Sequence, residues 1–278
     1  MSRILLPLAV LLFLIGCKVR RVAPATTRTD SLPVQPAGDS LPVKPAGRFI
    51  ALYGPATPDF EDFRSGLMAN RFLDTIATRL NDSLRIPTNI VLATAHCDEP
   101  NAAYNPASHT VTLCYELFKS LSERFMKEPG SDYLVSGTVV FALMHELGHA
   151  LVDVLALPTT GREEDAVDQL ATILMLQQGA TGDSLAFGAV GWFALKARSS
   201  ELDNLAFADD HGLDQQRVYN IICWIYGKDP DRYPEIVADT LLPLHRREGC
   251  PSEYYRVAES WRRLLAPFRP GAVTSPSP

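Results

Sequence analysis

The chain has 278 residues, of which 26 are Lys or Arg and 32 are Asp or Glu, so its formal net charge is −6. Hydrophobic residues make up 46% and charged residues 21%, which excludes a wholly disordered, fibrous or polytopic membrane protein. The sequence has no basic run, and neutralising phosphates requires clustered Lys and Arg, so we expect no nucleic-acid partner.

The first 16 residues have the pattern of a secretory signal peptide. An apolar run from Ile4 to Gly16 follows the basic Arg3 and has the length of a signal-peptide core, too short for a transmembrane helix. The run ends in Leu14-Ile15-Gly16-Cys17, which resembles the lipobox of bacterial lipoproteins. The sequence predicts export to the bacterial cell envelope and a lipid on Cys17 that anchors the chain to a membrane. An ordinary signal peptide with an incidental Cys is the alternative.

Residues 17–47 are rich in Pro, Thr, Ser and Ala. They contain a tandem repeat in which Asp30 to Gly38 is followed by the nearly identical Asp39 to Gly47. Prolines at this density remove backbone donors and favour extended chain, so we expect a tether that builds no core. One folded domain is predicted over residues 48–268, and the Pro- and Ser-rich residues 269–278 predict a disordered tail. The sequence does not indicate an oligomeric state.

The folded domain begins with a strand, a helix and a strand. Short apolar or β-branched runs predict strands over Phe49–Tyr53, Asn89–His96 and His109–Cys114, and amphipathic spacing predicts one helix over Phe60–Leu84. Helical patterns then follow over Tyr115–Lys127, Ser136–Leu155, Glu163–Gln178, Leu185–Lys196, Asp214–Tyr226 and Glu253–Leu265. A small N-terminal sheet followed by a mostly helical C-terminal half is an α+β fold.

Four cysteines remain after Cys17, an even number in a chain predicted to reach an oxidising compartment. We predict the disulfides Cys97–Cys114 and Cys223–Cys250, because each closes a short local loop. Four free thiols or zinc ligands are the alternative, although no CxxC spacing supports a metal site.

The segment Met144-His145-Glu146-Leu147-Gly148-His149 carries the chemistry. His145 and His149 lie one helical turn apart and project from the same face, a geometry that suits a zinc ion, with Glu146 beside them. The flanking residues are apolar nearly all round the predicted helix, so the helix is expected to be buried. Buried imidazoles need a partner or a metal.

A third ligand is available at the start of the next predicted helix. Glu164 and Asp168 lie one turn apart there, so Glu164 can complete a His₂Glu set while Asp168 accepts the second N–H of a ligand His. Asp165 or Asp168 as the third ligand stays open. A simple acidic N-terminal turn, favoured by the helix dipole, is the competing interpretation.

These residues resemble those of the zincin metallopeptidases, in particular the gluzincins, in which HExxH is joined by the Glu of an ExxxD motif. Together with Gln216-Arg-Val-Tyr-Asn220 and Cys223-Trp-Ile-Tyr-Gly227, they resemble a bacterial family of metallopeptidases of unknown function over Phe49 to Trp261. The resemblance implies a zincin-like fold, with the sheet packed on the active-site helix. The stretch from Ala150 to Glu163 is shorter than is usual in gluzincins, so the loop must turn back sharply.

The resemblance and zinc chemistry together imply one Zn²⁺ per domain and a peptide or protein substrate bound as an added strand along a sheet edge, in the segment from Asn101–Asn105 through Val111–Leu113. Glu146 would act as general base toward a metal-activated water. His211, beside Asp209, would steady the oxyanion, with Arg217 and Tyr219 as substitutes. The remaining histidines are interpreted as structural or surface residues; these are His96, His109 and His245. A non-catalytic metal-binding or structural envelope lipoprotein is the alternative function.

Overall fold

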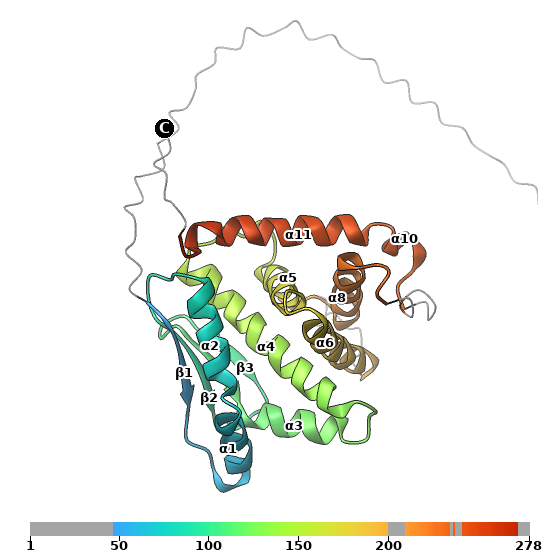
Figure 1. Ribbon diagram of the computed structural model, residues 1–278. Helices are drawn as coiled ribbons and strands as arrows, with labels where there is room; N and C mark the ends of the chain where they lie inside the picture. Colours follow the sequence, from blue (N-terminus) through green and yellow to red (C-terminus); the bar gives the residue numbers. More distant parts are fainter. Residues whose placement is uncertain (1–46, 200–208, 234–235, 237–240, 272–278) are drawn as a thin grey trace, which may run out of the picture. The chain divides into compact units, whose positions relative to one another are not determined.

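The computed structural model describes residues 47–199, 209–233, 236 and 241–271, all within one compact unit of the chain (Figure 1). The predicted signal peptide, Cys17 and all but the last residue of the predicted tether lie outside the described residues, as does most of the predicted tail. Cys97 and the other three cysteines of the domain lie within them.

A mixed sheet of four strands forms the N-terminal part. Its strands are β1 (Phe49–Tyr53), β2 (Ile90–Ala95), β3 (Ala102–Asn105) and β4 (Thr110–Cys114). Their order is β1-β2-β4-β3, with β2 parallel to both β1 and β4 and with β3 antiparallel to β4. β1 and β3 are therefore the two edge strands. Of the segment expected at the sheet edge, β3 lies at an edge, whereas β4 is an inner strand paired on both sides, which corrects that part of the expectation.

The rest of the unit is helical, so the α+β layout is confirmed. The helices are α1 (Glu61–Ala69), α2 (Phe72–Ser83), α3 (Tyr115–Phe125), α4 (Ser131–Val154), α5 (Glu163–Leu176), α6 (Ala180–Ser199), α8 (Asp214–Lys228), α10 (Leu244–Arg247) and α11 (Cys250–Leu265), with 3₁₀ turns at Pro58–Phe60 and Ala266–Phe268.

The single helix predicted over Phe60–Leu84 is wrong, because the structure has two helices there. Arg71 adopts a left-handed backbone with φ 50°, which a continuous right-handed helix does not allow. The Asn70 side chain donates to the Gly66 carbonyl and closes α1. Tyr53 accepts the Leu73 N–H through its hydroxyl, which ties the first turn of α2 to the end of β1.

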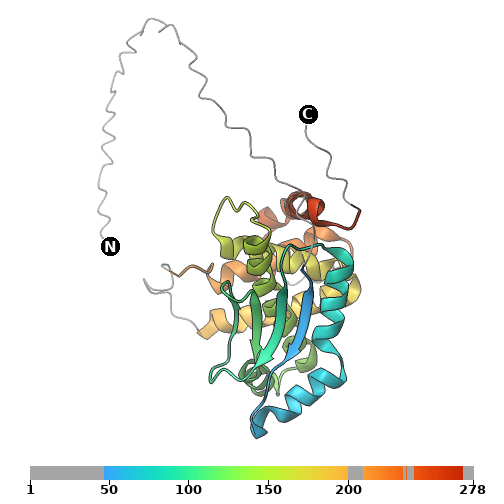
Figure 2. The ribbon, with the colours of Figure 1, turned by 90° about the vertical axis from the view of Figure 1, so that its left-hand side faces the viewer.

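Among the described residues, helices cover one face of the sheet and leave the other uncovered. α2 packs on β1 and β2, and α4 packs on β3 and β4. In the view turned by 90°, the strands face the viewer, with α1 and α2 beside them and other helices behind them (Figure 2). Ile50 and Leu52 are 41% and 52% exposed on β1, although parallel strands are ordinarily covered on both faces.

α4 is the central helix of the unit. It is long and apolar enough to cross a membrane, but 67% of its apolar window is buried among its neighbours, as in the core helix of a globular domain. It contacts the sheet, α3, α5 and α6. Glycines permit the closest crossing, since a Cβ on Gly137 would lie 2.2 Å from the carbonyl oxygen of Leu185 in α6. α4 therefore joins the sheet to α5 and α6 of the helical part.

Two disulfides join the four cysteines of the domain, in the pairing that the sequence predicts. Cys97 bonds to Cys114, with Cα atoms 5.5 Å apart, and Cys223 bonds to Cys250, with Cα atoms 5.1 Å apart. The first bond ties the loop after β2 to the end of β4, and the second ties α8 to α11. Disulfides are typical of exported chains, so this pairing agrees with export.

Candidate metal centre

His145 and His149 project from one side of α4, with their ring centroids 5.0 Å apart. The loop after α4 turns back sharply, as the short spacing requires. Ala156 has a positive φ of 49°, and the Leu157 N–H donates to the Val152 carbonyl, which folds the chain over the end of the helix. The first turn of α5 therefore lies beside His149.

Three imidazoles meet at the carboxylate of Glu164, in the first turn of α5. The Nε2 atoms of His145 and His211 each lie 3.0 Å from Oε2 of Glu164. Nε2 of His149 lies 3.3 Å from the other oxygen, Oε1. The structure thus brings together the four residues that the sequence places at the site as ligands or as the oxyanion donor.

Each of these imidazoles has a carboxylate at its other nitrogen. Nδ1 of His145 lies 2.8 Å from Asp168, Nδ1 of His149 lies 2.7 Å from Glu163, and Nδ1 of His211 lies 3.0 Å from Asp209. A carboxylate at Nδ1 fixes the tautomer and turns Nε2 toward the centre, as in metal-binding histidines. The residues of these pairs are His145, His149, His211, Asp168, Glu163 and Asp209.

Asp168 is held in turn by Arg217 of α8. The guanidinium donates from Nε and Nη2 to the two carboxylate oxygens, at 2.7 Å each. Its carbon lies 4.0 Å from the ring centroid of Phe193, and both charged groups are buried. Arg217 is therefore committed to Asp168, which corrects the expectation of a substitute oxyanion donor. The sequence gives no local signal for this pair, because it joins α5 to α8.

The charged groups around the centre shift one another's pKa values toward the charged forms. Burial alone would lower the pKa of His145, but the carboxylates of Asp168 and Glu164 raise it to about 9. The three imidazoles hold the pKa of Glu164 well below its usual range. Burial acts to raise the pKa of Asp168, but His145 and Arg217 outweigh it and leave that pKa lowered.

A metal ion fits these donors. Oε2 of Glu164 is buried and accepts no hydrogen bond from any described residue, although two imidazole nitrogens lie 3.0 Å away. Ligand atoms of His145, Glu164 and His211 lie within 4.8 Å of one another. Imidazole nitrogens and a carboxylate oxygen at this spacing are a ligand set for a divalent transition metal.

The alternative third ligands, Asp168 and Asp165, are each paired with an arginine. Both oxygens of Asp168 accept hydrogen bonds from Arg217. Asp165 pairs with Arg162 at 3.1 Å, and its side chain is 46% exposed. The arrangement therefore favours Glu164 as the third ligand.

Glu146 lies beside the imidazoles on α4 and faces the edge strand. Burial raises its pKa, while the nearby His145 and His149 and the backbone amide of Tyr104 in β3 act in the opposite direction. The net effect is a raised pKa, which brings the pKa of Glu146 closer to pH 7, where a general base works best. Glu146 thus lies between the candidate metal ligands and the sheet edge.

The remaining predicted positions lie away from the centre. His96 contacts Glu116, and His109 contacts the Tyr104 hydroxyl at 3.0 Å. His245 and Tyr219 are exposed. Glu163, the partner of His149, was missed by sequence reasoning, although its place next to Glu164 in an acidic first turn was a usable signal.

A family model described as "Putative metallopeptidase" matches residues 53–265 of the chain. The chain belongs to this family. The match spans strands β2 to β4, the three imidazoles, Glu164 and the Asp168–Arg217 pair. A metallopeptidase family implies a metal, and the group His145, Glu164 and His211 could hold one. Neither a curated protein nor a solved structure matches the chain significantly.

Close packing at Gly148 yields a prediction. A Cβ at Gly148 would lie 2.7 Å from the Cβ of Val167 in α5, so Gly148→Ala must push the two helices apart. We expect a loss of about 1–3 kcal/mol in unfolding free energy and weaker metal binding, measured by denaturation and metal titration. Gly161→Ala is the control, because nothing lies within 4 Å of its Cβ. Equal behaviour of the two variants would contradict this reading.

The raised pKa of His145 predicts how metal-free protein responds to pH. The folded-state pKa of about 9 lies above the ordinary value of about 6.5. Protonation therefore stabilises the fold fully below about pH 6.5, and this stabilisation is lost as the pH rises through about 9. Denaturation of metal-free protein across this window should show falling stability, with a smaller fall for His145→Gln. Stability that rises with pH in this window would exclude the assignment.

Proposed function

We propose that the protein is an exported zinc-dependent metallopeptidase that hydrolyses peptide bonds. The observation that carries the proposal is the convergence of three carboxylate-supported imidazoles on Glu164, next to Glu146 and the edge strand. Imidazole and carboxylate donors suit zinc, and the family is one of metallopeptidases. The α+β fold, with its sheet edge packed on α4, is consistent with a zincin-like architecture.

His145, His149 and Glu164 would hold the zinc. When bound, the metal supplies a Lewis acid that lowers the pKa of the attacking water. Glu146 takes a proton from the attacking water and later delivers it to the leaving amine. Asp168 and Glu163 keep His145 and His149 in the tautomers that present Nε2.

A peptide would bind in extended form along β3. This strand is one of the two edge strands of the sheet, and its Tyr104 amide lies near Glu146. An extended segment that adds to a sheet edge gains backbone hydrogen bonds whatever its side chains, which suits a peptidase. The Tyr104 hydroxyl donates to Asp153 of α4 at 2.6 Å, which holds the edge strand against the active-site helix.

The chain would work at the cell envelope, held by a lipid on Cys17. The support is the lipobox-like Leu14-Ile15-Gly16-Cys17 and the two disulfides of the domain. Mass spectrometry of the mature N-terminus should find an acylated Cys17. A mature chain that begins at another residue and has no acyl group would exclude the anchor.

A non-catalytic metal-binding lipoprotein is the second candidate. One observation favours it: the metal would meet four protein side chains if His211 also binds, and closed sites are typical of structural zinc. Glu146 argues against it, because a structural site needs no base. The two functions are separated by the variants below.

Substitution of Glu164 tests the ligand set. Glu164→Ala should remove most of the bound zinc, because the remaining donors lose their shared carboxylate. Asp165→Ala is the matched control, since Asp165 is the next residue but pairs with Arg162 near the surface. Zinc content of the two purified variants is the measurement. Full zinc in Glu164→Ala with loss in Asp165→Ala would make the ligand choice wrong.

Substitution of Glu146 tests catalysis. Glu146→Gln should retain the fold and the zinc and lose cleavage by about 10²–10⁴-fold, the range that proton transfer by a positioned side chain supplies. Cleavage of a broad peptide library, with zinc measured in parallel, is the assay. Unchanged cleavage in Glu146→Gln would exclude the mechanism. Zinc-loaded wild type that cleaves no peptide would favour the binding lipoprotein.

A further inference from the structure

His211 has the same relation to Glu164 as the histidines of α4. Its Nε2 lies 3.0 Å from Oε2 of Glu164, the same distance as Nε2 of His145. Its ring stacks on that of His145, with centroids 5.9 Å apart. Contacts with two candidate ligands, Glu164 and His145, therefore define the position of the His211 imidazole.

The place of His211 beside the other donors favours a ligand over an oxyanion donor. Zinc binds nitrogen and oxygen at about 2.0–2.2 Å, so neighbouring ligand atoms in a tetrahedral site lie about 3.3–3.5 Å apart. An oxyanion donor lies about 2.7–3.1 Å from the oxyanion, which itself occupies a ligand position, so the donor lies one atom farther from the metal. Nε2 of His211 lies 3.0 Å from Oε2 of Glu164, which is shorter than the spacing of two zinc ligands but equal to the contact that Nε2 of His145 makes. The ligand atoms of His145, Glu164 and His211 all lie within 4.8 Å of one another, so His211 has the place of a ligand in this group.

The support around His211 is also that of a ligand. Asp209 Oδ1 contacts Nδ1 of His211 at 3.0 Å and accepts its backbone N–H at 2.8 Å. Arg162, which precedes α5, donates to the His211 carbonyl at 3.4 Å. The imidazole is thus aimed at Glu164 by contacts on both its ring and its backbone, like the two histidines of α4.

We propose, on the basis of the zinc site inferred above, that His211 is a fourth protein ligand that closes the metal site in this state. The His211 side chain is 48% exposed, against 6% for His145 and 17% for His149, so it covers the solvent side of the site. A zinc with four protein ligands has no position for water, whereas a zinc with three has one. The protein as described is a resting form, and peptide hydrolysis requires His211 to leave.

Cobalt binding tests this ligand directly. Metal-free wild type, His211→Ala and His145→Ala are titrated with Co²⁺, and affinity and visible absorption are recorded. His245→Ala, at an exposed histidine remote from the site, is the control. We expect His211→Ala to bind Co²⁺ at least about tenfold more weakly, with an altered absorption spectrum because water replaces an imidazole.

The outcomes separate this inference from the proposed function. Wild-type affinity and spectrum in His211→Ala, with loss of binding in His145→Ala, would overturn the fourth ligand and leave the zinc site intact. No Co²⁺ binding by wild type would overturn both. A weakened His211→Ala with an altered spectrum, in a protein that cleaves no peptide, would uphold the ligand while the peptidase fails.

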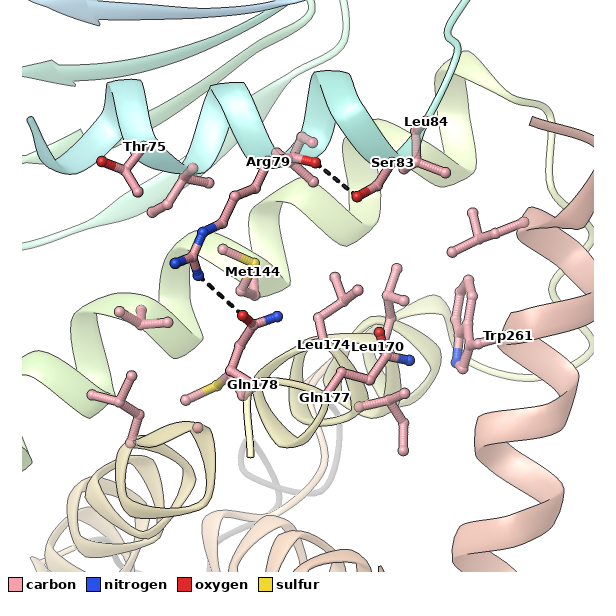
Figure 3. A pocket seen from close by; sticks show the side chains of 18 of the residues that line it. Thr75, Arg79, Ser83, Leu84, Met144, Leu170, Leu174, Gln177, Gln178 and Trp261 are labelled. Carbon is pink, nitrogen blue, oxygen red and sulfur yellow. Dashed lines mark hydrogen bonds between the residues drawn. The ribbon is translucent and has the colours of Figure 1, made fainter. Parts of the chain in front are cut away.

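A second inference rests on a separate cavity, on another side of α4. A cavity of about 740 Å³ lies between α2, α5 and α11, with α4 as its floor (Figure 3). Its walls are mainly apolar and include Ile76, Leu80, Met144, Leu170, Leu174 and Trp261. The volume falls within the range of about 300–1,000 Å³ that is usual for small-molecule sites.

The charges at this cavity have one sign. Arg79, Arg262 and Arg269 line it, and the described lining contains no Asp or Glu. Arg262 is neutralised by Glu259, but Arg79 bonds only to the neutral Gln178, and neither Arg79 nor Arg269 pairs with an acid among the described residues. Two unneutralised cations beside an apolar cavity, in a chain of net charge −6, match an anionic amphiphile.

We infer that this cavity binds a fatty acid, with its chain among the apolar side chains and its carboxylate at Arg79. Burial of the chain supplies about 0.8 kcal/mol for each CH₂ group, and guanidinium groups bind carboxylates well. Met144 and Leu170 are floor and wall residues on the helices that carry the metal ligands, so an occupant would also stiffen α4 against α5.

Calorimetric titration with dodecanoate tests the cavity, with zinc content measured as a check on folding. We expect one dodecanoate per chain, loss of binding in Leu174→Trp, which fills the space, and at least about tenfold weaker binding in Arg79→Gln. Arg256→Gln is the control, because Arg256 is exposed on α11 and does not line the cavity. No binding by wild type, or equal binding by zinc-loaded Leu174→Trp, would overturn the inference.

Discussion

The close approach of α4 and α5 at Gly148 is the constraint on which the site depends. Val167 packs where a side chain on Gly148 would otherwise lie, so the two helices meet at backbone distance. That contact places the acidic first turn of α5 beside the imidazoles of α4. Gly148, within the HExxH segment, therefore has a packing role. It affects the metal centre by fixing where Glu164 lies.

The second determinant is a buried line of alternating charge, from Arg217 through Asp168 to His145 and Glu164. Burying charges is costly unless each meets an opposite charge and hydrogen bonds, and Arg217, Asp168 and His145 do so through the bonds of Asp168. Glu164, at the end of the line, lies 3.0 Å from His145. The line connects α8 to α4 and α5. The C-terminal half of the unit thus orients a site whose motif lies in the middle of the chain, and the loop that carries His211 immediately precedes α8.

Much of this arrangement follows from local pattern. The helical spacing of His145 and His149, the acidic turn at Glu164 and the disulfide pairing all depend on short sequence separations, where periodicity and loop length are informative. The parts that sequence could not give depend on long-range or backbone detail. The left-handed Arg71 divides a helix whose apolar spacing is continuous, and the pairing of Arg217 with Asp168 joins residues that only the packing of α8 on α5 brings together.

The positions of the two disulfides have a consequence for the donors that a metal can meet in this domain. Both bonds lie outside the α4–α5 pair, one at the sheet and one between α8 and α11, and together they use all four cysteines of the domain. Thiolates are strong ligands for soft metals, and here oxidation removes them. With all four cysteines of the domain oxidised, the donors that the described residues bring to this centre are imidazoles and carboxylates, which suit a borderline metal better than a soft one.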